Sequence, residues 1–132
     1  MKELVSLLSA RPDVRLAVIY GSVARGDDRP RSDLDLLISF AREEAHTAAS
    51  LEVALTEAIG RRVQVVSLTT ARRAPLLLLD VLREGRVVLD RDDEWSALRG
   101  DEQRIQRQAA AAENRLDRGI AELAELVADS GS

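Results

Sequence analysis

The pattern of apolar and polar residues along the chain predicts short strands that alternate with helices. Residues 14–20 are almost continuously apolar and rich in β-branched side chains, as in a buried central strand. Residues 63–68 and 86–89 have a similar character over shorter lengths. Residues 33–40 alternate, which divides their side chains between two faces: Leu34, Leu36, Ile38 and Phe40 on one, and Asp33, Asp35 and Leu37 on the other.

Helices are predicted around these strands, where apolar residues recur three and four positions apart. Asp92 or Asp93 is expected to cap the last helix, and Gly100 with Asp101 to divide it. The fold class is therefore α/β (α+β), a small mixed sheet flanked by helices with a long C-terminal helical extension. The predicted helices cover residues 2–10, 43–59, 75–84 and 92–128.

The length of 132 residues fits one domain with little to spare. We expect a domain over residues 1–90 and a helical extension over residues 91–132, which either packs on the same unit or offers a surface to a partner. A helix of about 35 residues would run roughly 50 Å, longer than so small a core. This favours contact with a protein partner or a homo-oligomer, unless Gly100 or Gly119 folds the helix back. The extension carries one apolar stripe: Ile105, Ala109, Ala112, Leu116, Ile120, Leu123 and Val127.

Composition removes several classes of function. The chain has no cysteine, which excludes disulfides, thiolate metal sites and cysteine nucleophiles, and His46 is its only histidine. The net charge is −4, so the chain as a whole lacks the basic surface of a duplex binder, and direct nucleic-acid binding is not expected. No apolar run approaches the roughly 20 residues that span a membrane, and the expected location is the cytoplasm.

The candidate chemistry lies between the first two predicted strands, in the pattern G-S-x10-D-x-D from Gly21 to Asp35. Gly21 permits a tight turn and leaves room for a phosphate group, while Ser22 offers a hydroxyl and a backbone N–H. Arg25 either adds a charge-assisted contact to phosphate or is a solvated loop residue.

Asp33 and Asp35 are two positions apart on one strand, so both carboxylates project from the same face. Two neighbouring carboxylates repel each other unless a cation lies between them. Magnesium prefers one or two carboxylates together with substrate phosphate oxygens. The segment therefore predicts a site for a nucleotide and Mg²⁺.

This segment resembles the nucleotidyltransferase superfamily related to DNA polymerase β, and especially its minimal nucleotidyltransferases. The resemblance covers roughly residues 14–90 and includes the Gly-Ser turn, the spacing and the Asp pair. It implies transfer of a nucleoside monophosphate to an acceptor hydroxyl, with Gly21 and Ser22 holding the triphosphate and Asp33 and Asp35 as catalytic metal ligands. Minimal members often occur as antitoxins paired with HEPN-domain toxins, which implies AMP transfer from ATP to the toxin.

The family usually has a third carboxylate on a later strand, and the position aligned with it here is Gln64. A glutamine cannot act as a base and carries no charge. Two hypotheses follow: an adenylyltransferase that acts on a protein partner, or a catalytically impaired protein that neutralises its partner by direct binding. Transfer to a small molecule is a weaker third option, because the chain is short for such sites.

Overall fold

The computed structural model describes residues 2–26 and 33–130, so the predicted loop over residues 26–32 lies outside the described residues except for Gly26. Within these residues, four strands form one mixed sheet in the order β3-β2-β1-β4. The first strand pairs antiparallel with the second and the fourth, and the third runs parallel to the second. The strands are β1 (Val14–Tyr20), β2 (Leu34–Phe40), β3 (Val63–Ser67) and β4 (Arg86–Asp90).

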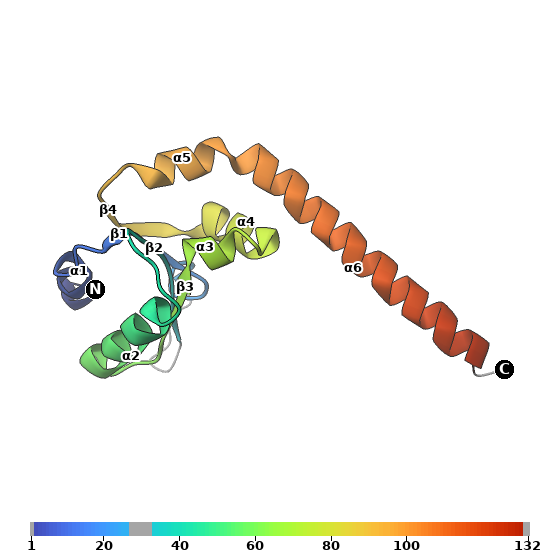
Figure 1. The fold of residues 1–132 in the computed structure, drawn as a ribbon, viewed down its shortest axis with the longest axis horizontal. Coiled ribbons are helices and arrows are strands. Elements are labelled where there is room, and N and C mark those ends of the chain that lie inside the picture. The colour runs from blue at the N-terminus through green and yellow to red at the C-terminus, as the bar shows by residue number, and fades with distance from the viewer. Residues whose placement is uncertain (1, 27–32, 131–132) are drawn as a thin grey trace.

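Helices cover both faces of this sheet (Figure 1). α1 (Lys2–Ser9) and α2 (Thr47–Ile59) pack on one face, where their leucines join a cluster with Leu34, Leu36 and Ile38. α3 (Leu68–Ala71) and α4 (Pro75–Glu84) pack on the other face, with Leu16, Val18 and Leu37. The two faces predicted for the second strand are thus confirmed, and so is the predicted α/β class.

The last two helices follow β4. α5 (Glu94–Gly100) contributes the buried Leu98 to the second cluster, and a break at Asp101 separates it from α6 (Glu102–Ser130). The predicted division near Gly100 is therefore present, whereas Gly119 does not interrupt the long helix. Figure 1 shows α6 leaving the domain and projecting far beyond it. None of the helices in the described part of the chain has the length and apolarity needed to cross a membrane.

The start of α2, the end of β3 and the cap of α5 differ from the sequence prediction. α2 begins at Thr47 instead of residue 43, because the Thr47 hydroxyl accepts a hydrogen bond from the Glu44 N–H at 2.9 Å and holds the preceding residues in a turn. The third strand stops at Ser67, whose Oγ accepts from the Thr70 N–H at 3.1 Å and starts the unpredicted helix α3.

The cap of α5 is the third correction. Neither Asp92 nor Asp93 caps this helix with its side chain; the Asp90 carboxylate instead accepts from the N–H groups of Glu94 at 3.0 Å and Trp95 at 3.2 Å. Asp92 is engaged elsewhere, in a pair of hydrogen bonds from the Arg15 guanidinium at 2.6 and 2.7 Å. This pairing lowers the pKa of Asp92.

Candidate functional site

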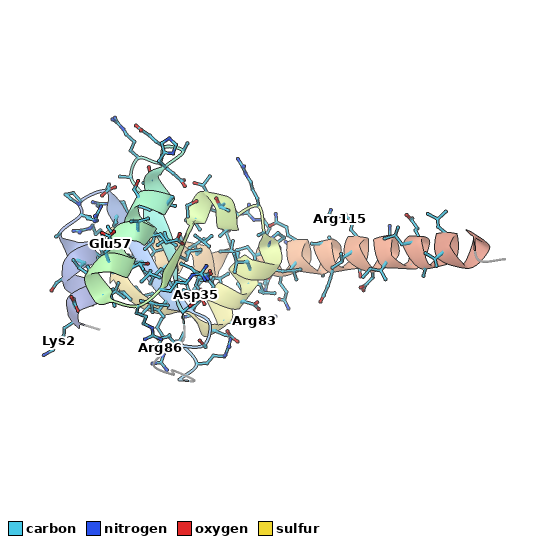
Figure 2. All side chains as sticks on the ribbon, turned by 90° about the horizontal axis from the view of Figure 1, so that it is seen from below. Lys2, Asp35, Glu57, Arg83, Arg86 and Arg115 are labelled. Atoms are coloured by element: carbon cyan, nitrogen blue, oxygen red, sulfur yellow. The ribbon has the colours of Figure 1, made fainter. Side chains whose placement is uncertain are left out.

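The candidate residues gather at one end of the sheet, where β1 ends and β2 and β3 begin. Tyr20 lies opposite Asp35 in the β1–β2 ladder, and Asp35 lies beside Gln64 in the β2–β3 ladder. Because residues paired across strands point to the same side, the three side chains share the face that α3 and α4 cover. Figure 2 shows Asp35 on the compact part of the molecule, well away from Arg115 on the projecting helix.

A helical turn follows β1 at this end. The Arg25 N–H donates to the Gly21 carbonyl at 3.2 Å, and the Gly26 N–H donates to the Val23 carbonyl at 3.2 Å. Gly21 has a φ of +76°, and a Cβ at this position would lie 2.6 Å from Oδ2 of Asp35. The turn that carries Ser22 is therefore directly adjacent to the Asp35 carboxylate, and a Cβ at Gly21 would force that carboxylate to move.

The two carboxylates are close enough to influence each other. Partial burial, and to a smaller extent the charge of Asp33, raise the pKa of Asp35 above its usual value. Burial and then the charge of Asp35 likewise raise the pKa of Tyr20. The site thus concentrates negative charge in a partly desolvated position, which a bound cation would stabilise.

Gln64 is tied to the first carboxylate. Its Nε2 donates a hydrogen bond of 2.9 Å to Oδ2 of Asp33, and Nε of Arg62 lies 3.9 Å from the same oxygen. The residue aligned with the family's third acid therefore orients Asp33 through an amide donor. Among residues 2–26 and 33–130, no group of three or more His, Asp or Glu side chains is arranged to hold a metal ion.

Arg25 reaches the end of α4. Its Nη1 lies 3.0 Å from Oε2 of Glu84, an ion pair between partly exposed side chains. Sequence reasoning missed Glu84 and Arg62, since neither belongs to the Gly-Ser or Asp-x-Asp pattern. The sequence does place Glu84 in the last turn of the helix that ends before Gly85. The chain then enters β4, the strand next to β1, which brings Glu84 to the end of the sheet near the site.

The residues present fit a divalent cation with a nucleotide. Each carboxylate has about four lone-pair sites, so Asp33 can accept from Gln64 and still coordinate a metal. Magnesium commonly takes one or two carboxylates and completes its shell with water and substrate phosphate. Asp33 and Asp35 would supply the carboxylates, beside a turn whose glycine leaves space for phosphate.

Comparison with solved structures shows the same fold in several proteins. A chain of the crystal structure of a toxin-antitoxin with AMP-PNP matches with a TM-score of 0.76 and 18% identity, over 91% of this chain and 97% of that chain. A chain of the toxin-antitoxin MntA-HepT matches with a TM-score of 0.70 and 16% identity, over 91% of this chain and 95% of that chain. A chain of the complex of a tri-AMPylated Shewanella oneidensis HEPN toxin with MNT antitoxin matches with a TM-score of 0.62 and 21% identity, over 87% of this chain and 93% of that chain.

Sequence comparison identifies the family. No curated protein sequence matches the chain. The model of the family described as polymerase beta, nucleotidyltransferase matches residues 2–94, from α1 to the start of α5 and including every predicted site residue. The match spans well over half of the chain, and it agrees with the resemblance drawn from the Gly-Ser turn and the Asp pair. The chain therefore belongs to the polymerase beta nucleotidyltransferase family.

Proposed function

We propose that this protein is a magnesium-dependent nucleotidyltransferase that transfers AMP from ATP to a hydroxyl group of a protein partner, and that it acts as the antitoxin of a HEPN-domain toxin. One observation carries the proposal: Asp33 and Asp35 lie side by side next to the Gly21–Ser22 turn, in a member of this family. Carboxylates, turn and family together support AMP transfer as the reaction.

The proposed reaction is an in-line displacement at the α-phosphorus. The acceptor oxygen forms a bond to this phosphorus, the bond to the β-phosphate oxygen breaks, pyrophosphate leaves, and the hydroxyl proton passes to solvent. Magnesium, when bound, supplies neutralisation of the charge that develops on the phosphate oxygens. Asp33 and Asp35 hold it, Gln64 keeps the Asp33 carboxylate in place, and the turn at Gly21 and Ser22 receives the triphosphate.

Arg25 has a defined part in this scheme. The triphosphate would offer its guanidinium a more highly charged partner than the Glu84 carboxylate, with which it forms a 3.0 Å ion pair. Both side chains of this pair are partly exposed, so the exchange costs little in the free protein. We therefore assign Arg25 to phosphate binding and Glu84 to holding Arg25 near the site.

The protein acceptor is supported by the structural relatives. Several structures that share the fold over nearly their whole chains are of toxin-antitoxin complexes, one with AMP-PNP and one with a tri-AMPylated HEPN toxin. These relatives are 18% and 21% identical to this chain.

A second candidate is a protein that binds nucleotide and partner without transfer. The observation in its favour is Gln64, which fills the position of the third acid and donates to Asp33 instead of adding a carboxylate. Under this reading the site holds magnesium and ATP weakly, and direct contact neutralises the toxin.

The deciding experiment measures transfer of label from ATP labelled at the α-phosphate to a HEPN toxin in the presence of magnesium. We expect labelling by the native protein and none by the double variant Asp33→Asn/Asp35→Asn. The matched control is Asp80→Asn/Asp117→Asn, which removes the same charge from exposed helix surfaces. Labelling that survives in the site variant would refute the mechanism.

Two further results separate the candidates. Calorimetry with ATP and magnesium reports binding without requiring turnover, so binding without labelling favours the second candidate. In that case Gln64→Asp, which exchanges the amide donor for a third carboxylate, should produce labelling where the native protein has none. No binding and no labelling would contradict both candidates.

A further inference from the structure

Nitrogen donors line the side of the Asp33 carboxylate that faces β3. Nε2 of Gln64 donates a hydrogen bond of 2.9 Å to Oδ2 of Asp33, and Nε of Arg62 lies 3.9 Å from the same oxygen. Arg62 directly precedes β3 and Gln64 is two positions further on, so the two side chains leave the strand on the same face. Oδ2 of Asp33 therefore has two nitrogen groups beside it, one of which belongs to a side chain with a full positive charge.

Backbone pairing holds these groups beside Asp33. The Leu34 N–H donates to the Arg62 carbonyl at 2.9 Å, which extends the parallel pairing of β2 and β3 by one residue. Arg62 is thus anchored next to Asp33, although its side chain is 73% exposed. The amide of Gln64 has one favourable orientation, because the reverse would place its Oε1 against Oδ2 of Asp33. The register of the sheet therefore determines which groups face this carboxylate.

The side of the two carboxylates that faces β1 has a different character. Asp35 lies opposite Tyr20 in the β1–β2 ladder, and its Oδ2 would be 2.6 Å from a Cβ at Gly21. The Asp35 oxygens are thus offered where the turn of Gly21 and Ser22 passes. A cation that binds both carboxylates and the triphosphate would lie on this side of the pair.

A second divalent cation would need further oxygen ligands. Magnesium is held by oxygen atoms in a nearly octahedral shell, and N–H donors cannot supply them. On the β3 side, a second ion would have to displace the Gln64 amide and approach the Arg62 guanidinium. Within the part of the chain that the structure describes, no third carboxylate is grouped with Asp33 and Asp35 to hold such an ion.

We propose that the site binds a single divalent cation, and that Gln64 and Arg62 take the place of a second one. This inference rests on the proposed function, because it specifies the metal content of the same nucleotide site. Compared with a site of three carboxylates and two divalent cations, this one lacks one negative and two positive charges, and Arg62 returns one positive charge. The net charge around the triphosphate is therefore the same. Arg62 is a positioning residue that acts through the Asp33 carboxylate.

Equilibrium dialysis against Mn²⁺ and α,β-methylene-ATP, which resists cleavage at the α-phosphorus, counts the bound metal without requiring transfer. The excess of Mn²⁺ and of nucleotide on the protein side gives their ratio, which should be one in the native protein. The double variant Arg62→Met/Gln64→Asp removes both donors and adds a carboxylate, so its ratio should be two. The matched control Arg107→Met/Gln108→Asp makes the same exchanges at exposed positions of α6 and should keep the native ratio.

A second comparison isolates the charge of Arg62. In chains that carry Gln64→Asp, adding Arg62→Met should tighten the second Mn²⁺ by at least about threefold, because the neighbouring positive charge is gone. Adding Arg62→Lys, which keeps that charge, should leave the affinity for the second ion nearly unchanged. Equal affinities in these two variants would overturn the role of Arg62.

The dialysis separates this inference from the proposed function. A ratio of two in the native protein would overturn the inference and leave the proposed function intact. A ratio of one in Arg62→Met/Gln64→Asp would show that these residues do not exclude a second ion, which also overturns it. No bound nucleotide in the native protein would contradict the proposed function and the inference with it.

Discussion

Gly21 combines a left-handed backbone conformation with a close approach to a site carboxylate. Its φ of +76° lies in the left-handed region, and its α-carbon approaches Asp35 so closely that a Cβ would lie 2.6 Å from the carboxylate oxygen. Gly26 shares the left-handed conformation, with a φ of +81°, but has open space around it. A substitution at Gly26 would therefore introduce backbone strain alone, whereas one at Gly21 would add a contact with the Asp35 carboxylate.

This difference gives a prediction for alanine at each position. Gly26→Ala should cost about 1 kcal/mol of unfolding free energy, and Gly21→Ala about 2 kcal/mol, because the second adds the contact with Asp35 to the strain. Urea unfolding measures both values. Calorimetry should show that magnesium-dependent ATP binding is lost only in Gly21→Ala; equal effects of the two substitutions would contradict this account of the site.

Asp35 is expected to lower the stability of the free protein. Burial and Asp33 raise the pKa of Asp35, so the folded state disfavours its charge, and the resulting loss of stability sets in as pH rises above the ordinary carboxyl range. Below the unfolded-state pKa the residue is protonated in both states and the effect disappears. The stability linked to Asp35 thus decreases with rising pH, opposite to a salt-bridged aspartate.

Asp35→Asn should therefore raise Tm at pH 7 by roughly 1–3 °C, about 0.5 kcal/mol after allowance for solvent screening, and leave Tm unchanged near pH 3. Thermal unfolding in the presence of a chelator measures this. Asp117→Asn on the exposed surface of α6 is the control and should change Tm little at either pH. A decrease in Tm at pH 7 would show that the Asp35 carboxylate stabilises the fold.

At the scale of the elements, α5 depends on a cap that sequence order alone does not reveal. Asp90→Ala should cost about 1 kcal/mol in urea unfolding, because it removes the acceptor for the N–H groups of Glu94 and Trp95. Asp93→Asn, at the nominal cap with a φ of +58°, should be nearly neutral since asparagine tolerates this conformation. The reverse order of effects would restore Asp93 as the cap.

The sheet was predictable because its strands carry strong patterns. β1 is apolar except for Arg15 and its terminal Tyr20, and the alternation in β2 assigns each side chain to the correct face. α3 escaped prediction since four residues are too few for a helical period, although Ser67 carried a capping signal. In the candidate site, the Gly-Ser turn and the Asp pair are local patterns, whereas the Arg25–Glu84 pair joins residues 59 positions apart. Such contacts depend on how α4 returns to the sheet, which no local pattern specifies.

At the scale of the whole molecule, α6 has two parts with different roles. Its first turns belong to the domain, since Ile105 is 2% exposed, whereas Leu116 is 60% exposed. The predicted domain boundary at residue 91 stays a prediction. The change from buried to exposed side chains along α6 lies further on, between Ala109 and Leu116. Ile105→Ala should cost about 2–4 kcal/mol and Leu116→Ala less than about 0.5 kcal/mol. Urea unfolding measures both values. Equal costs would show that the projecting part packs on the domain.

The projecting helix also changes how the molecule moves through solvent. At 1.5 Å per residue, the 29 residues of α6 extend about 43 Å. A body of this shape has a high frictional coefficient for its mass, tumbles anisotropically and leaves a gel-filtration column earlier than a sphere of 14.5 kDa. A single chain would thus resemble a compact dimer by elution volume.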